Sequence, residues 1–218
     1  MLSPAQGSVS PTADSIRTYT DMFESRYRDA AGDREHIPWS TGRPHKTLTN
    51  WLNARAPSLV RCGGQVLVVG CGLGEDAIEL AHRGYEVTAF DVSPTAIDWA
   101  KRNYPDAADI FHVADLFNPP AKWRHRFDLV VEINTIQSLP HAHRNDVVSA
   151  MAHFPAAHGH LLVICRASDE PVSLEAGPPW AVTKAELEAA AASAGLEAVE
   201  EASVFLDSND PPDRKSVV

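Results

Sequence analysis

The sequence predicts a doubly wound α/β fold, and three observations support this prediction. From residue 65 onwards, short apolar runs alternate with segments of helical length. The runs are apolar at consecutive positions, as expected for strands that are buried on both faces of a parallel sheet. A glycine-rich turn follows the first run, at the place where open α/β sheets bind their ligands. Right-handed connections would place the intervening helices on both faces of the sheet.

The expected elements follow in order along the chain. Residues 1–13 are rich in Ser, Pro, Ala and Gly without periodicity, so we predict a disordered tail there and a single domain over residues 14–218. Helices are predicted at 14–31, 44–55, 75–82, 95–103, 141–153 and 183–194, and strands at 65–69, 86–90, 109–113, 127–133 and 160–165. The last helix carries its own boundary signals, because Thr183 and Glu186 have the spacing of a capping box and Gly195 follows the helix end.

Composition and charge exclude several classes of function. The chain has 29 acidic and 19 basic residues and a formal net charge of −10. No Lys/Arg block occurs, so we expect no nucleic-acid partner. The apolar runs are far shorter than the ~18 residues of a membrane span, and the N-terminus lacks the pattern of a secretory signal, so we expect no membrane association and a cytoplasmic location. A monomer is the default expectation, with a dimer as the alternative.

Cysteine spacing argues against a metal site. Cys62, Cys71 and Cys165 are scattered and odd in number, and no Cys/His ligand spacing is present. We therefore predict neither a disulfide framework nor a bound metal.

The motif that carries chemistry is the glycine loop after the first predicted strand. It reads Gly70-Cys71-Gly72-Leu73-Gly74. A dinucleotide fingerprint would continue as GxGxxG, but position 75 is Glu. The acidic pair Glu75 and Asp76 would also repel a pyrophosphate at this helix start. A nicotinamide-dependent oxidoreductase is therefore a disfavoured alternative.

Carboxylates follow the next two predicted strands. Asp91 ends the second strand, where it is placed to accept hydrogen bonds from ribose hydroxyls. Asp115 follows the third strand, where it is placed to accept from an adenine amino group. Together with the glycine loop, these residues predict a nucleoside pocket without a phosphate site.

The glycine loop, Asp91 and Ala114-Asp115 together resemble the cofactor motifs of class I S-adenosylmethionine-dependent methyltransferases. The resemblance implies a Rossmann-like sheet of seven strands that ends in an antiparallel hairpin. That hairpin would occupy about 198–206 and 214–218, so the last strand is expected to be short or truncated. The resemblance also implies a helical cover (14–60) over the active site of a Rossmann-like core (65–218). S-adenosylmethionine would be the cofactor and S-adenosylhomocysteine the product.

A second resemblance rests on the segment before the glycine loop. Pro38-Trp39-x-x-Gly42-Arg43-Pro44 is similar to the corresponding segment of thiopurine S-methyltransferase-like enzymes, a branch that includes halide, thiol and heterocyclic-toxin methyltransferases. In that branch the tryptophan, here Trp39, lies near the cofactor. Gly177-Pro178-Pro179-Trp180 also fits bacterial members of this branch. The resemblance implies methyl transfer to S, O or N of a small aromatic or heterocyclic acceptor.

The two resemblances assign roles to individual residues. The expected cofactor-binding residues are Trp39, Gly70, Cys71, Gly72, Gly74, Asp91, Val92, Ala114, Asp115, Leu116 and Glu132. The expected acceptor-binding residues are Trp39, Arg43, Asn134, Thr135 and Trp180. A sulfonium is already an activated methyl donor, so a catalytic base is optional. The candidates for such a base are Glu132, His36 and His141, and the sequence does not single out one of them. A non-catalytic sensor that binds S-adenosylmethionine remains an alternative function.

Overall fold

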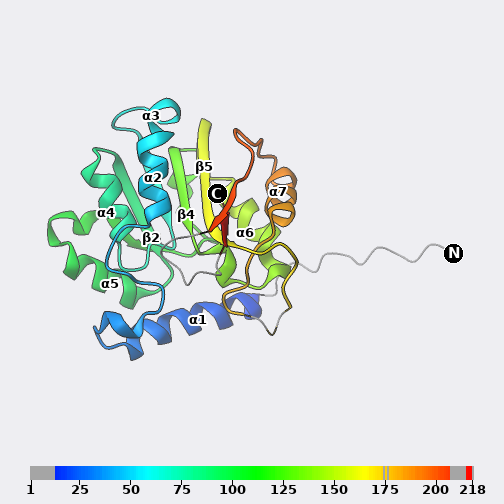
Figure 1. Cartoon of the computed structure of the whole chain (residues 1–218). Coiled ribbons are helices and arrows are strands. Elements are labelled where there is room, and N and C mark those ends of the chain that lie inside the picture. Colours follow the sequence, from blue (N-terminus) through cyan, green and yellow to red (C-terminus); the bar gives the residue numbers. More distant parts are fainter. Residues whose placement is uncertain (1–12, 174, 176, 207–214, 218) are drawn as a thin grey trace.

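Five parallel strands form most of the sheet, which Figure 1 shows together with its surrounding helices. The structure is a computed structural model that describes residues 13–173, 175, 177–206 and 215–217, so the predicted tail at residues 1–12 lies outside the described residues. The parallel strands are β1 (Gln65–Val69), β2 (Glu86–Asp91), β3 (Phe111–Val113), β4 (Phe127–Ile133) and β5 (Pro155–Ala167). Their order is β3-β2-β1-β4-β5, so the direction of winding reverses between β1 and β4. A reversal of this kind is where doubly wound sheets bind ligands.

Two strands of three residues each extend the sheet beyond β5. β7 (Lys215–Val217) pairs antiparallel with β5, and β6 (Val204–Leu206) pairs antiparallel with β7. The predicted α/β Rossmann-like class is confirmed. Its parallel part has five strands, and a count of seven is reached only with this short antiparallel pair. The predicted strand at 198–206 is reduced to β6, and residues 207–214 and 218 lie outside the described part of the chain.

Helices cover both faces of the sheet (Figure 1). On one face lie α2 (Lys46–Ala54), α3 (Ala56–Leu59), α4 (Glu75–His82) and α5 (Pro94–Asn103), and on the other α6 (Arg144–Met151) and α7 (Lys184–Ser193). Alternate residues of β1 point to opposite faces of the sheet. Val66 and Val68 pack in the core beneath α2 to α5, and Leu67 and Val69 pack in the core beneath α6 and α7. The remaining helix, α1 (Ala13–Asp29), crosses below the sheet in Figure 1 and contacts α5.

Two predicted elements are shortened by prolines. Residues 105–110 form a 3₁₀ helix that opens at Pro105, so only three residues of the predicted strand at 109–113 are extended. Pro140 precedes a 3₁₀ turn at His141–His143, and α6 begins only after it. Each proline lies before the predicted element, and the 3₁₀ turn that follows the proline takes up the first residues of that element.

Strand β5 is longer than predicted, whereas the last helix matches its signals. β5 starts before Gly159 because it continues through a register shift opposite Phe127 and Leu129. In α7, Thr183 and Glu186 form the predicted capping box, and Gly195 has a φ of 76° just after the helix.

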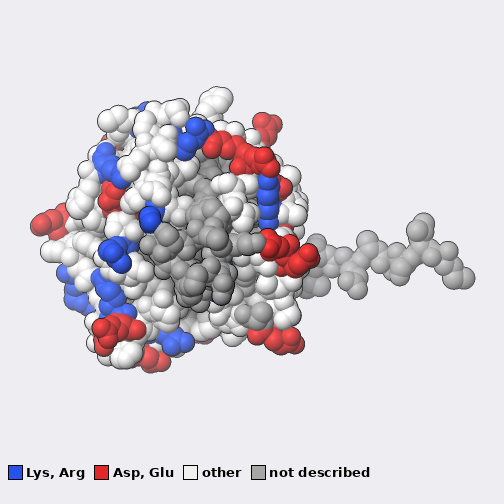
Figure 2. All heavy atoms as spheres, viewed as in Figure 1, with Lys and Arg blue, Asp and Glu red and all other residues white. Residues whose placement is uncertain are grey.

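Charged side chains are interspersed on the face shown in Figure 2, where Lys and Arg lie near Asp and Glu. Among the described residues of this face there is no continuous basic surface. No described helix is long and apolar enough to cross a membrane.

Candidate functional site

The glycine loop joins β1 to α4 at the carboxyl edge of the sheet. Gly70, Gly72 and Gly74 have φ angles of 62°, 53° and 93°, which residues with a side chain rarely adopt. Space is a second constraint, because a Cβ on Gly74 would lie 2.6 Å from the Phe111 ring and one on Gly70 would overlap Thr135 Oγ1. Backbone conformation and packing therefore both require glycine here.

Asp91 holds this loop from the neighbouring strand. Its carboxylate is 7% exposed and accepts hydrogen bonds from the N–H of Gly72 (2.9 Å) and the N–H of Ser93 (2.9 Å). Burial raises the pKa of Asp91, although the backbone hydrogen bonds oppose the rise. Each carboxylate oxygen has a further lone pair, so the group can also accept from a ligand hydroxyl.

Helix α1 contributes aromatic side chains that the sequence analysis missed. Tyr19, Phe23 and Tyr27, here called the aromatic row, are spaced by four and share one helix face. The Tyr19 ring lies edge-on to Trp180, with 5.9 Å between ring centroids. Phe23 and Tyr27 pack against Trp39 in the same manner, at 5.9 and 5.8 Å. The repeated spacing of aromatic residues was the signal that could have revealed this row.

A carboxylate attaches α1 to the start of α5. Glu24 Oε2 accepts from Ser93 Oγ (2.7 Å) and Thr95 N–H (3.2 Å), and its Oε1 accepts from Thr95 Oγ1 (2.6 Å). The partners are 69 and 71 residues apart in the sequence. Sequence reasoning gave no indication of this contact because it depends on the packing of α1.

Residues 34–45, here called the cover segment, are tied to the first turn of α4. Glu75 pairs with Arg34 and accepts from Ser40 Oγ (3.2 Å), while Asp76 accepts from His45 N–H (2.7 Å). Burial raises the pKa of Asp76 to about 6. The acidic pair that argues against a bound pyrophosphate therefore holds the cover segment in place.

Trp39 belongs to the cover segment and contacts Tyr27 of α1, whose hydroxyl lies beside the glycine loop. Its indole N–H donates to the hydroxyl of Tyr27 at 2.8 Å. That hydroxyl lies 3.0 Å from the position that a Cβ on Gly72 would take. Trp39 is thus separated from the loop by one side chain.

The chain after β4 forms the other wall of the glycine loop. Glu132 is fully buried, and its Oε1 accepts from the N–H of Thr135 and of Ile136 (3.0 Å), whereas Oε2 has no hydrogen-bond partner among the described residues. Burial raises the pKa of Glu132 to about 7, against the effect of these backbone hydrogen bonds. Asn134 has a φ of 65°, an uncommon conformation that is concentrated at functional sites.

Trp180 is anchored to this same wall. Its backbone N–H donates to the Gln137 carbonyl (2.7 Å), and its own carbonyl accepts from Arg144 Nη2 (3.0 Å). Arg144 also donates to the Ala181 carbonyl (2.8 Å) and pairs with Glu186 of α7 (2.7 Å). The structure therefore places the end of β4 against the glycine loop, Trp39 one side chain away from that loop, and Trp180 against the residues that follow β4.

The other predicted site residues differ in their exposure to solvent. Leu116 is buried, and the half-buried ones are Cys71, Val92 and Ala114. Burial raises the pKa of the Cys71 thiol, so this cysteine is not an activated nucleophile. The exposed ones are His36, Arg43, Asp115 and His141. Both candidate histidines are thus exposed, and the structure does not enclose them with the glycine loop.

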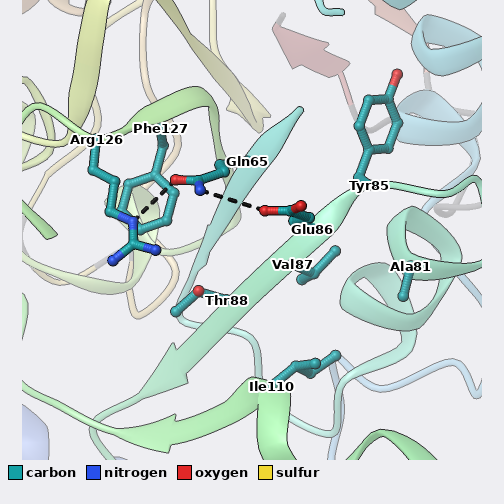
Figure 3. Close-up of a pocket in the computed structure, with 9 residues that line it drawn as sticks. All are labelled: Gln65, Ala81, Tyr85, Glu86, Val87, Thr88, Ile110, Arg126 and Phe127. Atoms are coloured by element: carbon teal, nitrogen blue, oxygen red, sulfur yellow. Dashed lines mark hydrogen bonds between the residues drawn. The ribbon is translucent and has the colours of Figure 1, made fainter. Parts of the chain in front are cut away.

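A hollow lies at the opposite edge of the sheet, and Figure 3 shows the residues that line it. It measures about 340 Å³ and lies near the starts of β1, β2 and β4. Arg126 Nε donates to Gln65 Oε1 (2.9 Å), and Gln65 Nε2 donates to Glu86 Oε2 (3.3 Å). Since open α/β sheets bind ligands at the carboxyl ends of their strands, we place the functional site at the glycine loop. In the described part of the chain, no group of three or more His, Cys, Asp or Glu residues is arranged to hold a metal ion.

Comparisons with known proteins show which family the chain resembles. The model of the thiopurine S-methyltransferase family matches residues 24–215. The chain is 31% identical over 161 residues to a 2-heptyl-1-hydroxyquinolin-4(1H)-one methyltransferase of Mycobacteroides abscessus. The aligned region covers 69% of this chain and 67% of that protein. The chain is 23% identical over 196 residues to thiocyanate methyltransferase 1 of Arabidopsis thaliana, covering 88% of this chain and 83% of that protein.

Solved structures share the fold. A 1,6-didemethyltoxoflavin-N1-methyltransferase of Burkholderia thailandensis, with bound 1,6-didemethyltoxoflavin and S-adenosylhomocysteine, superposes with a TM-score of 0.71 at 17% identity and covers 98% of this chain and 91% of that one. A magnesium protoporphyrin IX methyltransferase of Synechocystis PCC 6803 with bound S-adenosylmethionine has a TM-score of 0.66 at 15% identity, covering 91% and 94%.

The polar groups around the glycine loop fit the same cofactor. Asp91 is a buried acceptor beside the loop, and Glu132 Oε2 is a second buried acceptor that lacks a partner among the described residues. Both suit a ligand that carries ribose hydroxyls and an amino group. The chain belongs to the thiopurine S-methyltransferase family and is an S-adenosylmethionine-dependent methyltransferase of small molecules.

Proposed function

We propose that the acceptor is a flat aromatic heterocycle with an acidic hydroxyl or thiol, and that it binds between Trp39 and Trp180. The observation that carries this proposal is the aromatic row of α1, which packs against both tryptophans. From the 1.5 Å rise per residue, the contact at Tyr19 lies about 6 Å along the helix axis from the contact at Phe23 and about 12 Å from the contact at Tyr27. A bicyclic ring suits these separations, and aromatic walls favour flat ligands. Asn134 and Thr135 would meet the polar edge of the acceptor, and Arg43 would lie at the mouth of the site.

The cofactor lies along the glycine loop in this proposal. The backbone of residues 70–74 would face its methionine portion, and Asp91 would accept from the ribose hydroxyls. The adenine would lie by the residues that follow β2 and β3, which are Val92, Ala114, Asp115 and Leu116. The hydrogen bond between Gly72 and Asp91 supports this placement, because it holds the expected methionine and ribose sites next to each other.

The acceptor would ionise without a dedicated base. Glu132 Oε1 is engaged with the backbone after β4, and His36 and His141 are exposed. S-adenosylmethionine supplies an already activated methyl group when it is bound. An acceptor atom that is anionic near neutral pH then needs only in-line positioning and exclusion of water. The relative that is named for a 1-hydroxyquinolinone supports this class of acceptor.

The proposal is tested by methyl transfer from isotopically labelled S-adenosylmethionine to a panel of acceptors, read by mass spectrometry. The panel comprises 1-hydroxyquinolin-4-one, thiophenol, iodide and an aliphatic thiol. We expect label on the ring hydroxyl or the aromatic thiol and none on the aliphatic thiol. Transfer only to iodide or to the aliphatic thiol, or binding of S-adenosylhomocysteine without transfer to any aromatic acceptor, would overturn the proposal.

Phe23→Leu tests the aromatic row directly. The change removes one ring but keeps an apolar side chain, so the KM of the acceptor should rise about 2- to 10-fold while affinity for S-adenosylhomocysteine is unchanged. Met22→Leu, on the exposed side of the same helix, is the matched control and should change neither value. An unchanged acceptor KM in Phe23→Leu would remove the row from the acceptor site.

We further propose that the enzyme acts in the cytoplasm as a monomer whose partners are small molecules. The formal net charge of −10 supports the absence of a nucleic-acid partner. Size-exclusion chromatography with light scattering tests the monomer, and a stable mass of twice 23.7 kDa would contradict it.

A further inference from the structure

Tyr27 carries a buried hydrogen-bond donor that no described residue uses. The side chain is 3% exposed, and its hydroxyl accepts from Trp39 Nε1 at 2.8 Å. Among the described residues, the hydroxyl donates to no acceptor. A buried donor without an acceptor is costly, and one beside a ligand site points to a ligand atom.

The position of this hydroxyl narrows the choice of ligand atom. It lies 3.0 Å from the place of a Cβ on Gly72, at the glycine loop that faces the cofactor in our placement. Trp39 fixes its orientation, because the indole N–H occupies one lone pair and the two rings pack at 81°. Burial raises the pKa of the Tyr27 hydroxyl, and the nearby Asp91 adds to the rise, so the group stays protonated and keeps a hydrogen to donate.

The cofactor has one strongly accepting group in this region. Its ribose hydroxyls and its amino group are donors that suit carboxylate or carbonyl oxygens, whereas its methionine carboxylate needs donors. Three N–H groups of the loop are already bonded, that of Cys71 to the Phe90 carbonyl, that of Gly72 to Asp91 and that of Gly74 to the Cys71 carbonyl. Arg34 is paired with Glu75. The loop therefore leaves the carboxylate short of donors at the point where the Tyr27 hydroxyl lies.

We infer that the Tyr27 hydroxyl donates a hydrogen bond to the methionine carboxylate of S-adenosylmethionine, with Trp39 orienting it. The inference rests on the placement of the cofactor proposed above. It makes Tyr27 a cofactor-binding residue and Trp39 a positioning residue for this contact.

Calorimetric titration with two ligands tests the inference. S-adenosylhomocysteine carries the carboxylate, and 5′-methylthioadenosine lacks it but keeps the ribose and adenine. Tyr27→Phe keeps the ring and removes the donor, so affinity for S-adenosylhomocysteine should fall about 10- to 100-fold, the range expected for a hydrogen bond to a charged group. Affinity for 5′-methylthioadenosine should stay the same, which also shows that the variant is folded. Tyr85→Phe, at the hollow on the opposite edge of the sheet, is the matched control and should bind both ligands like the wild type.

Each other outcome overturns the inference in a distinguishable way. If Tyr27→Phe weakens both ligands equally, the residue acts on the ribose side or through the structure of the site. If it weakens neither, the hydroxyl does not contact the cofactor. If the wild-type enzyme binds neither ligand, the placement of the cofactor itself fails, and the inference fails with it.

Discussion

At the scale of single residues, Asp91 links the two halves of the proposed cofactor site. It is buried and bonded to the N–H groups of Gly72 and Ser93. Asp91→Asn keeps the shape of the side chain but removes its charge and one acceptor oxygen. We expect affinity for S-adenosylhomocysteine to fall by about 1–3 kcal/mol, measured by calorimetry. Asp98→Asn, an exposed change on α5, is the control, and equal affinities in the two variants would exclude Asp91 from the site.

Glu132 should make the stability of the fold depend on pH. Burial raises its pKa from 4.5 to about 7. Between these values the unfolded chain has released a proton that the folded protein still holds, so this carboxyl lowers stability progressively as the pH rises from 4.5 to 7. Glu132→Gln cannot ionise, and its stability relative to the wild type should increase across this window by about 3 kcal/mol.

Urea unfolding at pH 5 and pH 8 measures this difference. Shifts at other carboxyl groups are present in both proteins and cancel when the two are compared. Glu86→Gln, at an exposed position, should show no such trend. A stability difference between Glu132→Gln and wild type that is the same at both pH values would contradict the prediction.

At the scale of elements, α1 is attached to the rest of the molecule by Glu24. Three hydrogen bonds join its carboxylate to Ser93 and Thr95 at the start of α5. Desolvation opposes these bonds, but they hold the pKa of Glu24 below 4.5, so the attachment is complete at neutral pH and is lost on acidification. Glu24→Ala should therefore loosen α1 while the sheet remains folded.

Hydrogen exchange distinguishes loosening of α1 alone from loosening of the whole fold. Amide hydrogens of α1 should exchange about 10-fold faster in Glu24→Ala, whereas those of β4 should be unchanged. Asp21→Ala, an exposed change on the same helix, should leave both rates unchanged. Faster exchange of β4 together with α1 would show that the helix is not a separate opening unit.

The contrast between local and distant contacts explains what could be predicted from the sequence. The bounds of β1 and β4 match the prediction, because a continuous apolar run is a local property. The glycine loop also could be located, because strand ends of a parallel sheet meet at one edge. The roles of Glu24 and Tyr27 could not, since both depend on how α1 packs against segments far along the chain. The part of Glu75 in holding the cover segment was missed for the same reason, although its charge was noted.

At the scale of the whole molecule, the two edges of the sheet carry different structural features. The glycine loop, the cover segment and Trp180 lie at the carboxyl edge, while the hollow of Figure 3 lies at the opposite edge. Arg144 and Arg126 offer a comparison of the two edges. Arg144 is 4% exposed and joins the segment of Trp180 to α7, whereas Arg126 is exposed and bonded to Gln65.

Replacing each of these two arginines should show that the two edges of the sheet differ in their effect on stability and on acceptor binding. Arg144→Ala leaves the carbonyls of Trp180 and Ala181 without their donor and Glu186 without its cation, so unfolding in urea should show a loss of about 3 kcal/mol. Because the segment of Trp180 is then held less firmly, the KM of the acceptor should rise while affinity for S-adenosylhomocysteine is retained. Arg126→Ala should lower stability by no more than about 0.5 kcal/mol and leave both ligand parameters unchanged, since it alters only an exposed hydrogen bond. If the two variants lost stability equally, Arg144 would not be the residue that joins the acceptor side of the site to α7.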